Sequence, residues 1–208
     1  MPSDEDMLGY GAEAVVYRTE YLGRGAVVKS RRPKEYRHSE LDQRLRTSRM
    51  KNEARMMIES RKAGVRTPVI YDIDTVRCDI TMEYVAGPKV KDVLDSEPSK
   101  AKEVCEKIGE TVARLHNGRI SHGDLTTSNM ILMANGEICL LDLSLGNTLA
   151  ETEDMGVDIH LLERAFTSAH SGLESELEAM ISSYSKRMND SAIVLERVEE
   201  IRGRGRYT

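Results

Sequence analysis

One stretch in the second half of the chain constrains the fold and the chemistry more than any other. It begins as His122-Gly-Asp-Leu-Thr-Thr-Ser-Asn129, and Asp142 follows thirteen residues after Asn129, at the end of a predicted hairpin. Phosphoryl transfer from Mg-ATP requires a carboxylate near the attacking oxygen and two oxygen ligands that hold magnesium against the phosphates. We therefore expect Asp124 to be the catalytic base or the group that orients the nucleophile. Asn129 and Asp142 are the expected magnesium ligands.

A glycine-containing segment near the N-terminus, Gly9-Tyr-Gly-Ala-Glu-Ala14, lies between two predicted strands. Glycine allows backbone amides to approach a phosphate closely because no Cβ intervenes. The segment is no dinucleotide-binding fingerprint, since alanine replaces the third glycine and a strand follows, and the chain contains no G-x-x-x-x-G-K-[ST] motif. The residues expected to contact a nucleotide here are Gly9, Gly11, Ala12 and Glu13.

A lysine on the next predicted strand strengthens this interpretation. Lys29 follows two valines and lies eighteen residues after Gly11, the arrangement in which a lysine reaches the α- and β-phosphates. Such a lysine needs a carboxylate from the following helix to orient it. Glu40, Glu53 and Glu59 are the candidates, and Glu53 is favoured because it adjoins the apolar stripe of that helix.

The pattern of strand and helix signals predicts an α+β chain in two lobes, residues 1–85 and 86–208. Strands are expected over 14–21, 26–30, 69–74 and 78–85, with a helix over 39–62 that Gly64 caps. Ala86-Gly-Pro88 marks the lobe boundary, and Glu83-Tyr84 just before it is expected to offer backbone hydrogen bonds to adenine. The second lobe is predicted to be mainly helical, with a helix from about Pro98 and others over 157–169, 173–188 and 190–201.

Two further expectations concern loops in this lobe. The hairpin of residues 129–133 and 138–143 is expected to turn at Asn135-Gly136, a pair suited to type I′. The arginine-rich end, residues 202–208, should be mobile. His122 is expected to brace the catalytic loop, and Asp158 to cap a helix or, by modest preference, to hold the backbone of that loop.

The charge distribution is uneven. The net charge is −5, yet the segment from Arg24 to Arg66 contains 14 Lys and Arg against 5 Asp and Glu. Two explanations stay open, a solvated basic helix face or a surface for a phosphate-rich polymer. The three cysteines form no C-x-x-C pair, and no apolar run is long enough for a membrane span. We therefore expect a cytoplasmic protein with no membrane contact.

The motifs described above, the lysine of a strand, His122 to Asn129 and then Asp142, follow the order found in protein kinases. Beyond this general kinase pattern, several segments together resemble one family. They are Gly-Ala-Glu-Ala14, Arg32-Pro-Lys-Glu-Tyr-Arg37 with the helix after it, His122 to Asn129, and Val157-Asp-Ile with Leu162-Glu-Arg-Ala165. They resemble the small atypical kinase subunit of the KEOPS (EKC) complex, the PRPK-like family. The resemblance implies a minimal two-lobed protein-kinase-like fold, binding of ATP with Mg²⁺ or Mn²⁺, and ATPase or autophosphorylating activity. It also implies partners: the KEOPS subunit that forms threonylcarbamoyladenosine on tRNA, and tRNA itself through the basic N-lobe helix and the C-terminal tail.

Departures from ordinary protein kinases limit the expected substrates. Asp142-Leu-Ser replaces Asp-Phe-Gly, only sixteen residues separate Asp142 from Asp158, and no Ala-Pro-Glu follows. Thr126 stands where kinases that act on proteins usually carry lysine. Two alternatives remain, a small-molecule kinase of the aminoglycoside or choline type and a pseudokinase scaffold that binds tRNA and a partner without chemistry.

Overall fold

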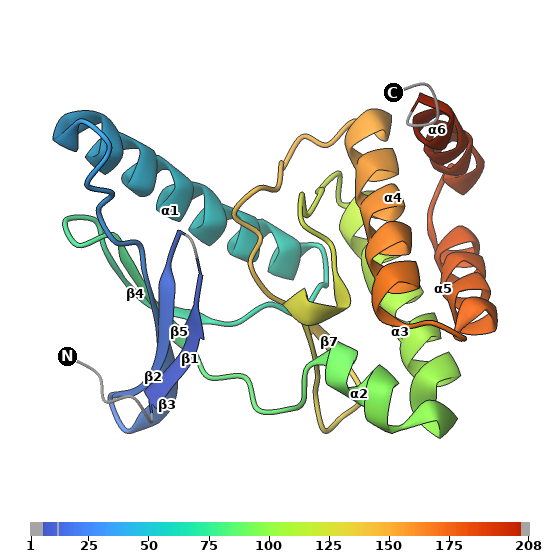
Figure 1. Cartoon of the computed structure of the whole chain (residues 1–208), viewed down its shortest axis with the longest axis horizontal. Coiled ribbons are helices and arrows are strands. Elements are labelled where there is room, and N and C mark those ends of the chain that lie inside the picture. The colour runs from blue at the N-terminus through green and yellow to red at the C-terminus, as the bar shows by residue number, and fades with distance from the viewer. Residues whose placement is uncertain (1–5, 12, 205–208) are drawn as a thin grey trace.

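The chain folds into an N-terminal sheet crossed by one long helix and a C-terminal helical part (Figure 1). The computed structural model describes residues 6–11 and 13–204. The sheet is antiparallel with strand order β1-β2-β3-β5-β4. Its strands are β1 (Met7–Tyr10), β2 (Val15–Tyr21), β3 (Arg24–Ser30), β4 (Ile70–Asp74) and β5 (Asp79–Glu83), and the long helix is α1 (Ser39–Lys62). The predicted α+β architecture, a small sheet with one long helix followed by a mainly helical part, is confirmed.

The tight connection between β2 and β3 fixes their register. Leu22 and Gly23 both have positive φ, 50° and 76°, which is the geometry of a type I′ turn. Seven consecutive residues of each strand then pair, from Tyr21 opposite Arg24 to Val15 opposite Ser30. In this register Lys29 lies opposite Val16 on one side and Ile80 on the other.

Helix α1 begins and ends where the sequence predicts. Gly64 follows it with φ of 78°, and its amide donates to the carbonyl of Arg61 at 3.0 Å. A glycine in this left-handed conformation is a common way to end a helix. The buried face of α1 is rich in methionine (Met50, Met56, Met57) but also buries Glu53. A carboxylate in such a place requires a charged partner, and the site below supplies it.

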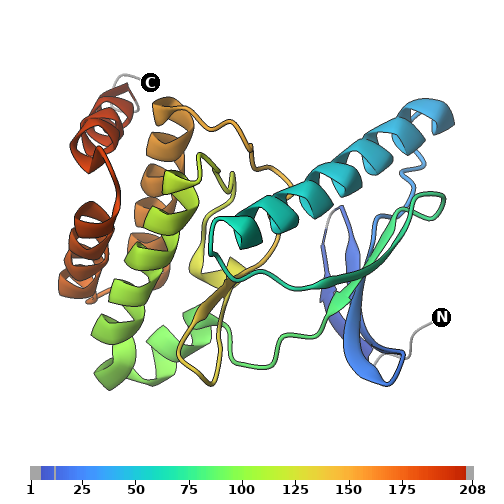
Figure 2. The same cartoon turned by 180° about the vertical axis from the view of Figure 1, so that it is seen from behind.

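The C-terminal part is mainly helical, and its two-stranded hairpin lies on the side that faces the N-terminal sheet (Figures 1 and 2). Gly109 allows helices α3 (Pro98–Asn117) and α5 (Glu174–Arg187) to approach closely. A Cβ at this position of α3 would collide with the backbone of Met180 and Tyr184. The elements are α2 (Val90–Ser96), α3 (Pro98–Asn117), β6 (Met130–Leu132), β7 (Ile138–Leu140), α4 (Thr152–Ala169), α5 (Glu174–Arg187) and α6 (Ser191–Arg204). Within residues 6–11 and 13–204, no helix has the length and apolar content needed to cross a membrane.

Several local predictions for this part were wrong. The sequence predicted no helix over α2, and α4 begins at Thr152 rather than 157 because Glu151 and Asp154 form a capping box. The β6–β7 turn is not type I′, since only Gly136 has positive φ (81°). Its amide donates to Met133 at 2.8 Å, so a three-residue loop with one left-handed glycine connects the strands.

The expectation of a mobile C-terminus fails for residues 202–204, which extend α6. Arg202 donates to Glu163 at 2.5 Å, and Arg204 donates to Glu153 at 2.8 Å. These ion pairs attach the end of α6 to α4. Residues 205–208 lie outside the described residues.

We propose residues 86–88 as the boundary between an N-terminal lobe of residues 1–85 and a C-terminal lobe of residues 86–208. Gly87 has φ of 148°, and a Cβ there would collide with the carbonyl of Leu132. The connection therefore requires glycine to pass so close to β6.

Candidate active site

A cavity of about 350 Å³ lies between the sheet and the helical part. Its apolar walls include Val16, Val27, Met82, Ile131 and Leu141. At one end the lining becomes charged and polar, with Lys29, Glu53, Asn129 and Asp142. We call it the central cavity. A largely apolar lining with a charged group at one end matches the polarity of a nucleotide, whose base is apolar and whose phosphates are anionic.

Lys29 stands at the charged end and connects three elements. Its side chain on β3 is 9% exposed, and Nζ lies 2.6 Å from Oε1 of Glu53 on α1. The same nitrogen lies 2.7 Å from Oδ1 of Asp142, which follows β7. The structure thus brings together a lysine and two carboxylates that are far apart in the sequence, as the spacing argument required.

A second cation, Arg31, shares Glu53 with Lys29. Arg31 is 3% exposed, and its Nη2 lies 2.7 Å from Oε2 of Glu53. Both oxygens of Glu53 are therefore engaged, each by a different cation. The sequence analysis missed Arg31, although it lies two residues after Lys29, just past the end of β3, where the alternation of an extended strand directs both side chains to the same side.

Asp142 adopts a left-handed backbone conformation with φ of 54°. Its Oδ1 also accepts a hydrogen bond from Ser144 Oγ at 2.8 Å. Burial raises the pKa of Asp142, but the Lys29 ammonium and its hydrogen bond outweigh burial and hold the pKa below its usual range. The carboxylate is therefore ionised at neutral pH, the state in which it can bind a hard cation.

Asp124 and Asn129 are joined directly. A short 3₁₀ turn over Thr127–Asn129 brings Asn129 back toward Asp124. Its Nδ2 donates to the backbone oxygen of Asp124 at 3.0 Å and to Oδ2 at 2.9 Å. Because the amide nitrogen faces Asp124, Oδ1 is the atom of Asn129 that could hold a metal ion.

His122 and Asp158 hold the backbone of this loop through hydrogen bonds. His122 is fully buried, its Nδ1 accepts from the amide of Asp124 at 3.2 Å, and its Nε2 donates to the carbonyl of Leu141 at 2.9 Å. Burial lowers the pKa of His122, so the ring is neutral and braces the loop. Asp158 accepts from the amides of His122 at 2.5 Å and Gly123 at 2.8 Å. It thus holds the loop backbone and does not cap α4, whose N-cap is Glu151.

Replacing Asp158 with alanine should therefore destabilise the protein by about 2–4 kcal/mol, because two buried amides lose their charged acceptor. Urea unfolding measures this loss. Asp154→Ala on the same helix, which removes only the capping-box carboxylate, should cost about 1 kcal/mol. Equal costs for the two variants would mean that the loop does not depend on Asp158.

The residues of the glycine segment that were predicted to contact a nucleotide do not all lie at the central cavity. Gly9 lies in β1 and lines the central cavity, whereas Ala12 lies outside the described residues. The amide of Gly11 donates to the carbonyl of Ala14 at 3.0 Å. Glu13 faces away from the central cavity toward a separate basic one.

We call this second cavity the arginine cavity. Two of its lining side chains are Glu13 and Leu45. The others are cationic: Arg31, Arg32, Lys34, Arg37, Arg46 and Arg49.

Glu83 and Tyr84 both line the central cavity, as expected for the segment that connects the two parts. Their side chains have other contacts. The Glu83 carboxylate is paired with Arg66 and accepts from the amide of Val69 at 3.0 Å. The amide of Tyr84 donates to Gly25 at 3.2 Å, and the Arg18 guanidinium lies 4.4 Å from the centre of its ring. The amide of Glu83 likewise donates to the carbonyl of Val69 at 2.8 Å, so both backbone amides of this pair are already engaged within the protein.

The apolar residues of the central cavity were also missed. Val27 lies two residues before Lys29 on β3, and Val16 lies opposite Lys29 on β2. Period-two alternation from Lys29 would have indicated Val27. Met82 could not be found in this way, because its position depends on the pairing of β3 with β5.

The sequence is similar to those of known proteins. Residues 3–169 match the protein kinase domain family. The EKC/KEOPS complex subunit Tp53rkb of Mus musculus is 38% identical over 211 residues, which cover 97% of this chain and 86% of that protein. The chain belongs to the PRPK-like family of kinase-fold EKC/KEOPS subunits. The predicted family is confirmed.

Other PRPK-like sequences agree. The EKC/KEOPS complex subunit bud32 of Dictyostelium discoideum is 33% identical over 96% of this chain and 82% of that protein. A probable bifunctional tRNA threonylcarbamoyladenosine biosynthesis protein of Methanosarcina barkeri is 44% identical over 97% of this chain. This chain spans only 36% of the length of that archaeal protein.

The fold is also found in a solved kinase. The Rio2 kinase of Chaetomium thermophilum, in its ADP/Mg²⁺-phosphoaspartate complex, superposes with a TM-score of 0.65 over 96% of this chain and 70% of that one. The identity is 14%, so this likeness supports the fold alone. The aminoglycoside- or choline-kinase alternative is not favoured, because the relatives named above are EKC/KEOPS subunits.

Proposed function

We propose that the chain is a Mg-ATP-dependent atypical serine/threonine kinase and ATPase that works as the kinase subunit of a KEOPS assembly. In that assembly it would be required for threonylcarbamoyladenosine modification of tRNA in the cytoplasm. The observation that carries the ATP chemistry is the contact of Lys29 with Glu53 and Asp142, beside the Asp124–Asn129 pair. A scaffold without chemistry would not need to bury these charges together.

Each side chain has a distinct task in this proposal. Lys29, held by Glu53, neutralises phosphate charge at the end of the central cavity. Asp142 and Asn129 hold Mg²⁺ or Mn²⁺, which neutralises the charge on the transferring phosphoryl group when bound. Asp124 lies beside Asn129 and orients the attacking hydroxyl or water. Positioning and electrostatics supply most of the rate in this chemistry, and the braced loop of His122 and Asp158 provides such positioning.

The acceptor is restricted by the segment after Asp142. Helix α4 begins only ten positions after Asp142. The part of this segment near Gly146 packs tightly, because a Cβ at Gly146 would collide with Ser121 and Met56. This segment offers little surface on which to seat a peptide. Water and the protein's own serines and threonines are therefore the favoured acceptors.

The isolated chain should thus show weak autophosphorylation and poor labelling of generic peptides. ATP hydrolysis should rise when the threonylcarbamoyladenosine-forming subunit and tRNA are added, because a docked partner can order the catalytic loop. Radiolabelled ATP assays with and without the partner, tRNA and a peptide substrate test this. Efficient peptide labelling by the isolated chain, at about 1–100 per second, would favour a conventional signalling kinase instead.

For tRNA, we propose contacts through the basic face of α1 and the C-terminal tail. Arg44, Lys51 and Arg55 are exposed on α1. In the tail, Arg202 and Arg204 are already paired with carboxylates of α4. Phosphates would have to compete with these carboxylates, so the tail should contribute less to affinity per arginine than α1.

A further inference from the structure

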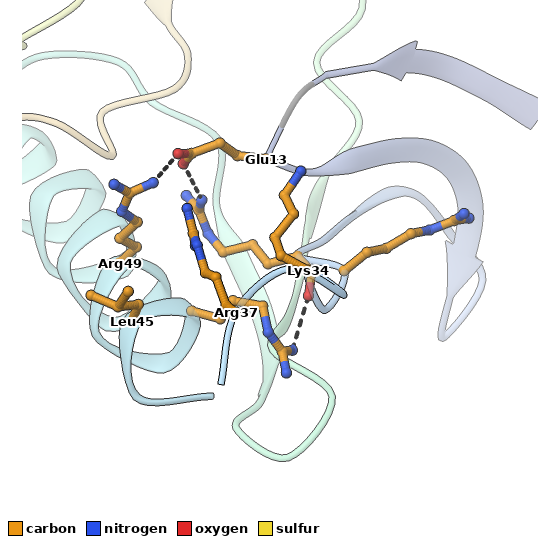
Figure 3. Close-up of a pocket in the computed structure, with 8 residues that line it drawn as sticks. Glu13, Lys34, Arg37, Leu45 and Arg49 are labelled. Atoms are coloured by element: carbon orange, nitrogen blue, oxygen red, sulfur yellow. Dashed lines mark hydrogen bonds and ion pairs between the residues drawn. The ribbon is translucent and has the colours of Figure 1, made fainter. Parts of the chain in front are cut away.

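The arginine cavity lies outside the central cavity, between the glycine segment, residues 31–37 and the first half of α1 (Figure 3). Six of its eight lining side chains are cationic and only one is acidic. Packing so many like charges together is costly unless anions compensate them. The acidic partners that are present therefore indicate how the cavity is used.

Its inner arginines are fixed by buried contacts. Arg31 is held by Glu53, as described above. Arg46 donates to Oδ2 of Asp42 at 2.6 Å and to the backbone oxygen of Arg31 at 3.0 Å. Asp42 is 2% exposed, so both guanidinium groups are held in place before any ligand arrives. Such preorganisation lowers the entropic cost of binding an anion.

Glu13 already occupies the cavity as an anion. Figure 3 shows its carboxylate extending from the glycine segment toward Arg49 on α1. It is paired with Arg49, and Oε2 lies 3.4 Å from Nη1 of Arg31. The hydrogen bond from Arg49 lowers the pKa of Glu13, against the opposing effect of burial. Only about 10 Å³ remains free between the lining side chains, so another anion could enter only if Glu13 left.

The outer cations are less completely paired than the inner ones. Arg37 makes only a loose ion pair of 3.6 Å with Asp42 and contacts the ring of Tyr36. Arg32 donates to the neutral hydroxyl of Tyr10 at 2.8 Å. Glu13, Asp42 and Glu53 together supply three negative charges to the six cations, so the cavity keeps an excess of positive charge. A chain of phosphates could compensate this excess, because each offers several acceptor oxygens that match the guanidinium fork, and neighbouring phosphates reach inner and outer cations together.

We propose that the arginine cavity binds a backbone phosphate of RNA, and that Glu13 is the internal anion which this phosphate displaces. The inference rests on the proposed contact between RNA and the basic face of α1, and it deepens that contact to one site. Displacement frees the glycine segment from α1, because Glu13 connects the two through Arg49. RNA binding would in this way change the freedom of a segment whose first glycine lines the central cavity.

The variant Glu13→Gln tests whether Glu13 competes with RNA phosphate, because competition predicts that its loss of charge raises the affinity for RNA. The variant keeps the side-chain shape but weakens the hold of Arg49 and Arg31. Affinity of the full chain for fluorescently labelled tRNA transcript, measured by anisotropy, should therefore rise about fivefold, the factor for one exposed ion pair. The matched control is Glu40→Gln, which makes the same charge change at an exposed position of α1 outside the cavity and should change affinity less than about twofold. An equal rise in both variants, or a loss of affinity in Glu13→Gln, overturns the proposal.

Arg49→Ala tests the site from the cationic side. We expect the slope of log affinity against log salt to fall by about one, as for loss of one phosphate contact. Arg187→Ala is the matched control, because Arg187 is also an exposed arginine paired with one carboxylate, that of Glu110, but lies on α5 in the helical part, and thermal melts check that each variant folds. A separate arm uses inorganic phosphate and pyrophosphate as competitors. If these bind and tRNA does not, the cavity is a free-phosphate site and the RNA proposal is wrong.

The outcomes separate this inference from the proposed function. If wild type, Glu13→Gln and Arg49→Ala bind tRNA equally, the arginine cavity is not an RNA site, and tRNA contacts α1 at other residues. If the variants behave as expected while Mg-dependent ATP turnover is absent, the site stands and the ATP chemistry is wrong.

Discussion

Asp142→Asn should lower Mg-dependent ATP turnover by on the order of a thousandfold, the cost of removing one preorganised charge from a transition state. Among the described residues that line the charged end of the central cavity, the carboxylates are Glu53 and Asp142. Both oxygens of Glu53 are bonded to cations, whereas Lys29 and Ser144 both contact Oδ1 of Asp142. The affinity of the Asp142→Asn variant for nucleotide should become independent of magnesium. Ser144→Ala, which removes only a hydrogen bond to the same carboxylate, should have a far smaller effect.

The fold should survive this substitution, so the loss can be assigned to chemistry. Asparagine tolerates the left-handed conformation of residue 142, and Lys29 keeps its contact with Glu53. The low pKa of Asp142 makes its ionised form stabilising above its unfolded pKa of about 3.9, and this contribution is lost as pH falls through the folded value. Any stability difference between wild type and variant should therefore vanish at acidic pH. Unchanged turnover in Asp142→Asn would rule out the assigned magnesium role.

The second large effect is expected at Asp124. Asp124→Ala should reduce turnover by about 10²–10⁴, the range for a positioned acid or base, while the affinity for MgADP stays within about twofold. Binding should persist because Asn129 still donates to the backbone oxygen of residue 124. Steady-state turnover and MgADP titration are measured on the same preparation. If Asp124→Ala and Asp142→Asn lose nucleotide affinity equally, the division between orienting group and metal ligand is wrong.

Local signals predicted much of this structure. The end of α1 could be predicted because its signal is local: Gly64, which adopts a left-handed conformation, lies two residues after the last residue of the helix. The spacing of Asp124 and Asn129 predicted their proximity because one 3₁₀ turn joins them. Asp158 was harder, since its partners lie 35 and 36 residues away, and only a modest preference favoured the contact that the structure shows.

Other features depend on contacts that no local pattern contains. Glu13 was expected beside a nucleotide, but its partner Arg49 lies 36 residues later, and the nearest glycines gave no hint of it. The end of α6 was expected to be mobile because its composition suits a tail. Glu153 and Glu163, on a different helix, supply the charges that hold it.

The charged group around Glu53 has a consequence for how this sequence can change over time. Lys29, Arg31, Glu53 and Asp142 form a chain of contacts with two positive and two negative charges. Losing any one leaves an unmatched charge in a largely buried place, which is costly. Energies of substitutions within such a network are not additive, so the effect of a change at one position depends on the others. These four positions should therefore vary together or not at all, and a descendant that abandoned phosphotransfer would be expected to lose them as a set.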